Sequence, residues 1–164
     1  MANMCYNYVT CTGSTTDIDR LESTLREGIK HSELHHEASD LGVEIQEAYF
    51  FSIEIGDKLP TALQFSYETK WSTNLLDLAE LCKRLNLSAV CEYNECGVEL
   101  YGSAHISPDG TIINDEVPAD FLNLIELDEE TDLYIYNGIE YNTQGDIINE
   151  HYADWKKSQL KTEE

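Results

Sequence analysis

Apolar and polar residues alternate in several segments of this chain and follow a helical spacing in two others. Residues 4–12 are rich in β-branched and aromatic side chains and stop at Gly13, which predicts a strand. An amphipathic helix up to about Lys30 is expected next, because apolar side chains recur every three or four residues at Ile18, Leu21, Leu25 and Ile29. The run Thr16-Asp-Ile-Asp19 fits a capping box at the start of this helix. The polar segment 31–41 predicts a loop or a fraying extension of this helix.

A hairpin is expected from 47–55 and 62–70, separated by the turn residues Gly56 to Pro60. In its first strand, Tyr49, Phe51, Ile53 and Ile55 alternate with Phe50, Ser52 and Glu54. Ser72 can cap a second helix, whose apolar face is expected to contain Leu75, Leu78, Cys82 and Leu85. A strand at about 88–94 completes a β-α-β-β-α-β order, which is the ferredoxin-like arrangement.

The remaining residues predict further β structure. The segment 98–106 alternates, with Val98, Leu100, Gly102, Ala104 and Ile106 on one face and His105 outward beside Tyr101 and Ser103. Turn residues at 107–110 and Asn137-Gly138 predict hairpins, the second between 133–136 and 139–142. Gln144-Gly-Asp146 predicts a turn, and 149–161 a short terminal helix. The expected fold class is therefore α+β. Residues 1–164 are expected to form a single domain, with a ferredoxin-like core at 1–94 and an acidic, β-rich extension at 95–164.

Two segments resemble a family of ferredoxin-like proteins of unknown function from phages and conjugative plasmids, the Api-type family. The first is the opening run Asn3-Met-Cys-Tyr-Asn-Tyr-Val-Thr-Cys-Thr-Gly13. The second is Phe65-Ser-Tyr-Glu-Thr-Lys-Trp-Ser72, which is similar to a family strand that ends in Thr-x-Trp-Ser. The resemblance covers about 3–30 and 62–104 and implies a mobile-element origin. It implies structural roles for the motifs, with Gly13 in a turn and Trp71 as a core or edge anchor.

Charge is the unusual feature of the composition. The formal net charge is −22, and residues 85–155 contain 16 acidic residues but no Lys or Arg. Such a surface attracts basic partners and repels phosphate, so direct nucleic-acid binding is not expected, although Tyr6 and Tyr8 on a ferredoxin-like sheet would suit RNA. The residues expected to bind a partner are Glu92, Glu95, Glu99, Asp109, Asp115, Glu116, Asp120, Glu126, Asp128, Glu129, Glu130 and Asp132.

Cysteine and hydropathy patterns indicate the compartment. The five cysteines (Cys5, Cys11, Cys82, Cys91 and Cys96) form no Cys-x-x-Cys pair and predict buried thiols in a reducing compartment. No apolar run is long enough to cross a bilayer, and the first residues lack the pattern of a signal peptide. These features predict a protein of the host cell cytoplasm with no membrane association.

No motif for catalysis or for a cofactor is present. The sequence has no nucleophile elbow and no Gly-rich phosphate loop, and His105 and His151 have no recognisable nucleophile partner. An enzyme and a cofactor are therefore not expected. His31, His35 and His36 form an incomplete ligand set for a metal, and Asp128 to Asp132 lacks the glycine of a calcium-binding loop.

The charge and the resemblance together suggest a function. The hypothesis is a non-enzymatic inhibitor that imitates the charge of nucleic acid and binds a basic nucleic-acid-binding surface of a host defence complex, such as a CRISPR effector or a restriction complex. The alternatives are a generic interaction module with another partner, and a small metal-binding protein. A salt-adapted cytosol would also explain the acidity. The oligomeric state stays open.

Overall fold

The structure is a computed structural model that describes residues 3–95, 97 and 99–160. The chain divides into two compact units, Met1–Glu116 and Val117–Glu164. The sequence had suggested a division at 94/95 inside one domain. The boundary between the compact units lies further on because two more strands pair with the first sheet.

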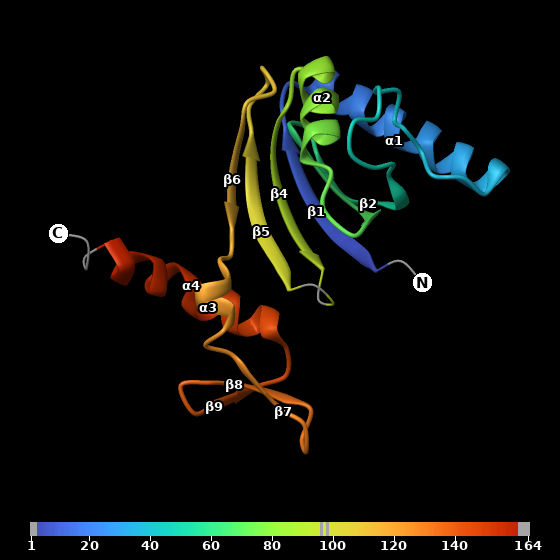
Figure 1. Cartoon of the computed structure of the whole chain (residues 1–164). Coiled ribbons are helices and arrows are strands. Elements are labelled where there is room, and N and C mark those ends of the chain that lie inside the picture. The colour runs from blue at the N-terminus through green and yellow to red at the C-terminus, as the bar shows by residue number, and fades with distance from the viewer. Residues whose placement is uncertain (1–2, 96, 98, 161–164) are drawn as a thin grey trace. The chain divides into compact units, whose positions relative to one another are not determined.

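The first unit contains a six-stranded antiparallel sheet in the order β2-β3-β1-β4-β5-β6 (Figure 1). Its elements are β1 (Met4–Thr12), α1 (Thr15–His35), β2 (Phe51–Leu59), β3 (Ala62–Lys70), α2 (Leu75–Leu85), β4 (Ser88–Glu95), β5 (Leu100–Ile106) and β6 (Ile112–Glu116). The first four strands have the order β2-β3-β1-β4 with α1 and α2 as the connections, which confirms the predicted ferredoxin-like core.

The helices cover one face of this sheet. The buried core joins alternate residues of β1 to the apolar sides of both helices, including Val9, Leu21 and Leu78. The predicted face of α2 is confirmed, since Leu75, Leu78, Cys82 and Leu85 are all buried. Four cysteines, Cys5, Cys11, Cys82 and Cys91, are buried as expected, and Cys96 lies outside the described residues, as does Val98. Burial raises the pKa of the Cys5 thiol to about 11 and that of the Cys91 thiol to about 12, so neither is a nucleophile at neutral pH.

The start and the end of α1 differ from the prediction. The cap is Ser14 rather than Thr16, since the Ser14 hydroxyl accepts a hydrogen bond from the Asp17 N–H at 3.2 Å. The helix runs beyond Lys30 to His35, so the start of the polar segment is the helical extension that the sequence allowed, and the loop begins after it. Polar side chains continue this helix on its solvated side until His36 adopts a left-handed conformation (φ 55°) and ends it.

The start of α2 also differs. Its N-cap is Asn74, not Ser72, and the Asn74 side chain makes no cap hydrogen bond. Asn74 Oδ1 instead accepts the Tyr67 hydroxyl at 2.7 Å, and the Asn74 side-chain amide donates to the Ala48 carbonyl at 2.8 Å. The helix begins where this buried network holds Asn74.

A bulge shifts the phase of β2. Ser52 has a φ of 47°, and the pairing of β2 with β3 changes register between Phe51 and Glu54. The predicted alternation is therefore wrong before Ile53. Phe50 is fully buried against Tyr67, with ring centroids 4.7 Å apart, whereas Tyr49 is exposed.

The motifs that resemble the Api-type family build a buried polar network. The Asn7 amide donates to Thr69 Oγ1 at 3.1 Å, and Asn7 Oδ1 accepts the Thr73 hydroxyl at 2.7 Å. Thr69 in turn donates to the Ser72 carbonyl at 2.6 Å. Trp71 is not a core side chain, because it is 53% exposed and follows β3 with a φ of 71°.

The second unit has a small three-stranded sheet in the order β7-β8-β9 and two helices. Its elements are α3 (Ala119–Leu122), β7 (Glu126–Asp128), β8 (Leu133–Tyr136), β9 (Ile139–Tyr141) and α4 (Gln144–Leu160). The predicted turn at Asn137-Gly138 is confirmed, and both residues have positive φ, as a tight hairpin turn requires. The terminal helix begins at Gln144 rather than 149, because the Thr143 hydroxyl accepts the Asp146 N–H and makes the predicted turn the first helical turn.

Among the described residues, no helix is both long enough and apolar enough to span a membrane.

Candidate functional site

The sheet face turned away from α1 and α2 is the open face. Tyr6 and Tyr8 of β1 are 44% and 52% exposed on it, although β1 is a central strand. Residues directly opposite each other in an antiparallel pair lie on the same face. The strand registers therefore define one row across all six strands, called here the acidic row: Glu54, Ser66, Tyr8, Glu92, Ser103 and Asp115.

A second row lies beside the first. It contains Phe51, Glu68, Tyr6 and Asn94 on neighbouring strands. The Lys70 ammonium lies 5.0 Å from the centroid of the Phe51 ring. On the other side of the acidic row are Thr10, Val90, His105 and Ile113, and His105 is exposed as the sequence predicted.

Two hollows open on this face. The larger has a volume of about 520 Å³, and its lining includes Tyr8, Glu54, Gln64 and Glu92. The smaller has a volume of about 220 Å³ and is lined in part by Tyr6, Tyr8, Glu54 and Glu68. Carboxylates and exposed tyrosines thus share the same two depressions.

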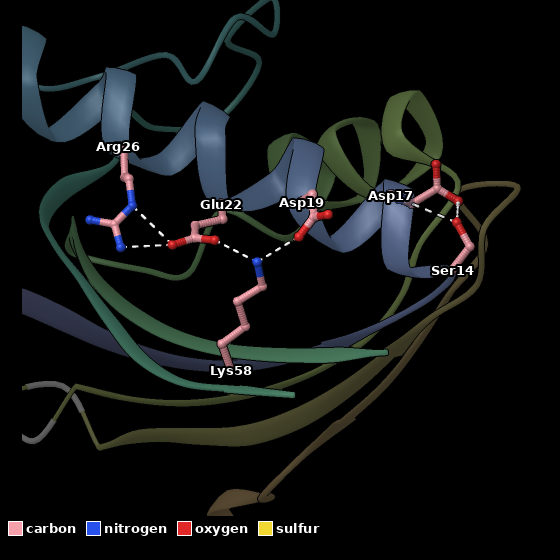
Figure 2. Close-up of polar contacts among 6 residues, drawn as sticks. All are labelled: Ser14, Asp17, Asp19, Glu22, Arg26 and Lys58. Atoms are coloured by element: carbon pink, nitrogen blue, oxygen red, sulfur yellow. Dashed lines mark hydrogen bonds and ion pairs between the residues drawn. The ribbon is translucent and has the colours of Figure 1, made fainter. Parts of the chain in front are cut away.

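The basic residues of the first unit lie mostly on the helix side. Lys58 forms ion pairs with Asp19 and Glu22 of α1 (Figure 2). Its Nζ is 2.6 Å from Asp19 Oδ1 and 2.6 Å from Glu22 Oε2. Arg26 binds Glu22 as well, with Nη2 2.7 Å from Oε1. The pKa of Glu22 is lowered, first by its hydrogen bond from Lys58 and then by that from Arg26.

The other bases of this unit are also placed mainly on helices. Arg20 and Lys30 are on α1, Lys83 and Arg84 are on α2, and Lys70 alone is on the open face. Arg84 donates to the carbonyls of Leu41 and Gly42, which lie in the segment between α1 and β2. The two sides of the sheet therefore differ in charge: six of the seven basic residues of this unit lie on the helix side, where Arg20, Arg26 and Lys58 pair with acids, whereas the open face combines carboxylates with Lys70.

The predicted partner-binding residues do not lie on one surface. Glu92 and Asp115 are on the open face, and Glu116 has the opposite phase on β6. Glu99 and Asp109 lie in turns at opposite ends of β5. Apart from Glu95, the others belong to the second unit: Asp120, Glu126, Asp128, Glu129, Glu130 and Asp132.

Glu95 is not a surface residue. It is 3% exposed, because the alternation of β4 turns it toward the same side as Cys91 and Tyr93. Its carboxylate accepts the Gly97 N–H at 2.9 Å. The prediction of Glu95 as a contact residue is therefore wrong.

The acidic run at 128–132 forms a turn in the second unit. Asp128 Oδ1 accepts the Glu130 N–H at 2.9 Å, and the Asp128 carbonyl accepts the Asp132 N–H at 2.8 Å. The hydrogen bond from Glu130 is the main reason that the pKa of Asp128 is lowered. This carboxylate thus stabilises its own turn.

The histidines near the end of α1 are exposed. The rings of His31 and His35 have centroids 4.6 Å apart, and His36 ends the helix. In the part of the chain that the structure describes, no group of three or more His, Cys, Asp or Glu side chains is placed to hold a metal ion.

The sequence reading missed the acidic residues of the first half. Glu54 and Glu68 are not in the predicted set, because the net charge of residues 1–84 is modest and gives no sign of an acidic face. A signal was available: in a ferredoxin-like order the helices cover one face, so outward residues of the central strands face away from them. This rule applies to Tyr6 and Tyr8 of β1, and Glu68 of β3 follows it as well.

An antiparallel sheet in the order β2-β3-β1-β4, with both helices on one face, defines an α+β protein of the ferredoxin-like class. The family model of the ferredoxin-like domain in Api92-like proteins matches residues 48–137, more than half of the chain, and the chain belongs to this family. The match confirms the resemblance to this family and includes the second motif, Phe65–Ser72, while the first motif at residues 3–13 lies outside the matched range. No curated protein and no solved structure matches the chain.

Proposed function

We propose that this chain is a non-enzymatic binding protein whose open face occupies a basic surface of a partner protein. The surface it blocks is one that otherwise binds nucleic acid. In the narrower form of the proposal, the partner is a defence complex of the host, such as a CRISPR effector or a restriction complex.

The separation of charge across the sheet supports this proposal. Lys58 and Arg26 are paired with acids on the helix side, whereas Glu54, Glu68 and Glu92 surround the exposed tyrosines on the other. A face on which carboxylates outnumber basic groups, here with Lys70 as its one described lysine, raises the rate at which a basic surface is met. Exposed tyrosines add apolar area with little conformational entropy to lose, as interface centres require.

The same tyrosines could suggest an RNA-binding sheet, which stacks bases on aromatic side chains. Here Glu92 lies directly opposite Tyr8, and Glu68 lies directly opposite Tyr6. Carboxylates at these positions repel the phosphates that accompany every stacked base. The open face therefore favours a basic protein over RNA.

Binding to purified candidate complexes tests the proposal. The full chain is titrated against a CRISPR effector and a restriction complex of the host, with duplex DNA as competitor. We expect DNA to displace the chain, and the affinity to fall steeply with salt because the contact is electrostatic. A variant with Glu54→Lys and Glu92→Lys should lose binding. A control with Glu27→Lys and Glu33→Lys on the exposed side of α1 should keep it.

Charge reversal in the second unit is compared with charge reversal on the open face. A variant reversing Glu126, Asp128, Glu129 and Glu130 has a larger charge change outside the open face. If this variant loses binding while Glu54→Lys with Glu92→Lys retains it, the open face is not the contact surface. Binding that neither DNA nor salt weakens would overturn the proposal itself.

A further inference from the structure

The two hollows of the open face are neighbours and share part of their lining. Tyr8, Glu54 and Ser66 belong to both. Tyr8 is the exposed aromatic residue of the larger hollow, and Tyr6 joins it in the smaller. Each hollow therefore combines an exposed phenol ring with at least two carboxylates.

The chemistry of each hollow fits a guanidinium group. A guanidinium is planar and stacks on an aromatic ring, while its N–H groups point outward in the plane and can reach carboxylates beside the ring. Strands are about 4.8 Å apart, so Glu92 is one strand from Tyr8 and Glu54 is two strands away on the other side. A lysine ammonium can also lie over a ring, but it has no plane to stack flat on it and no fork of N–H groups to reach two carboxylates at once.

The spacing of the two tyrosines sets the spacing of the ligands. Tyr6 and Tyr8 are two residues apart on β1, which corresponds to about 7 Å along a strand. Alternate side chains of any extended peptide have the same separation and point to the same side. Two arginines separated by one residue would therefore reach both hollows at once.

We propose that the open face is a receptor for an extended Arg-x-Arg segment of a protein, with one guanidinium over Tyr8 between Glu54 and Glu92 and the other over Tyr6 beside Glu68. This inference rests on the proposed function and specifies the partner chemistry of the same surface. Affinity then depends on arginine rather than on positive charge in general.

Peptide titrations of the full chain test this inference. The probes are a blocked Ser-Arg-Ser-Arg-Ser peptide, its lysine counterpart, and a Ser-Arg-Arg-Ser-Ser peptide of equal charge. Binding is followed by the NMR signals of the tyrosine rings. We expect the first peptide to bind about 2- to 5-fold more tightly than the lysine peptide, the range of an exposed cation–π contact. The peptide with adjacent arginines should also bind more weakly, because its side chains point to opposite sides.

Aromatic variants separate stacking from charge. Tyr8→Phe keeps the ring and should keep the preference for arginine, whereas Tyr8→Leu should reduce it to what the Tyr6 ring supplies, and Tyr6→Leu with Tyr8→Leu should abolish it. Tyr49→Leu is the matched control, since Tyr49 is about equally exposed but lies outside the hollows. Melting curves show whether each variant is folded. If Tyr8→Leu does not fold, Tyr8→Phe still tests the stacking, because loss of the preference for arginine in a variant that keeps the ring would contradict it.

Glu54→Gln separates the proposed arginine receptor from the more general proposal of an acidic binding face. Equal affinity for the arginine and lysine peptides, with loss of affinity in Glu54→Gln, would overturn the arginine receptor and leave an acidic binding face. Equal affinity for the two arginine spacings would overturn the two-hollow geometry. If no peptide binds and the charge-reversal variants still bind the purified complexes, both the receptor and the proposed function are wrong.

Discussion

Tyr8 of β1 and Glu92 of β4 lie directly opposite each other near the middle of the six-stranded sheet, on the face that the helices leave uncovered. The pair places an aromatic ring beside a carboxylate on two interior strands. Neither side chain belongs to the buried core, and both are exposed. Both side chains are therefore available to a binding partner, and the Glu92 charge adds to the repulsion among the acids of the chain.

Removal of the carboxylates beside Tyr8 is expected to make the protein more stable. The chain has a net charge of −22, and at low salt its acids repel one another over about 30 Å. The double variant Glu54→Gln with Glu92→Gln should therefore melt at a higher temperature than the parent at about 10 mM NaCl, and the gap should close at about 500 mM. A lower melting temperature at both salt concentrations would mean that these acids stabilise the fold.

Asp77 is expected to be important for stability. It is fully buried on α2, and its carboxylate accepts the N–H groups of Gln46 at 2.6 Å and of Glu47 and Ala48 at 3.0 Å. Asp77→Asn removes the charged acceptor and should lower the free energy of unfolding by about 2–4 kcal/mol in urea titrations. The exposed Asp57→Asn is the matched control and should change it by less than about 0.5 kcal/mol. Equal effects of the two substitutions would contradict the role of the buried carboxylate.

The ion pairs of Lys58 predict a dependence on pH. The pKa of Glu22 lies below its ordinary 4.5, chiefly because Lys58 donates to it, and the pKa of Lys58 lies above its ordinary 10.5, first because of Asp19. The stabilisation by these ion pairs is thus fully present between pH 4.5 and pH 10.5, the ordinary pKa values of the two groups. It is lost as the pH falls through the lowered pKa of Glu22 or rises through the raised pKa of Lys58.

Lys58→Met tests this dependence, with Lys30→Met on α1 as a charge-matched control. The parent should be more stable than Lys58→Met at pH 7, and the difference should shrink at acid pH. It should also shrink in high salt, because the groups are partly exposed to solvent. A difference that persists at pH 2 would assign the effect to packing of the lysine side chain.

Gly102 of β5 is expected to tolerate no larger side chain. It pairs with Tyr93 of β4, and a Cβ at Gly102 would overlap the Tyr93 ring and hydroxyl. Tyr93 also donates to Asn114 Oδ1 at 2.8 Å, which fixes the ring. Gly102→Ala should lower the free energy of unfolding by about 1–3 kcal/mol, as overpacking does. Gly145→Ala in α4, where a Cβ meets nothing closer than 3.7 Å, should be neutral or stabilising.

The sequence predicted most of the elements because their patterns are local. The helical face of Leu75, Leu78, Cys82 and Leu85 and the Asn137-Gly138 turn are confirmed. The errors occur where tertiary contacts override the local pattern. Asn74 replaces Ser72 as the cap of α2 because hydrogen bonds to Tyr67 and Ala48 hold it in place. The bulge at Ser52 changes the phase of β2, and Phe50 is buried.

The candidate site was predictable only in part. Glu92 and Asp115 were identified from the acidity of their segment, but the same criterion included the buried Glu95 and omitted Glu54. Charge along the chain does not say which face of a sheet a residue occupies. Strand phase does, and one bulge or one turn changes it.

The sequence by itself determined the order of the elements, the ferredoxin-like core and the uneven charge, since these depend on residues close together in the chain. Only the tertiary structure decided that β5 and β6 extend the first sheet. It also decided that Glu54, Tyr8 and Glu92 share one row, although they lie far apart in the sequence. The reason is that strand pairing and register are set by hydrogen bonds between distant segments, which no local pattern contains.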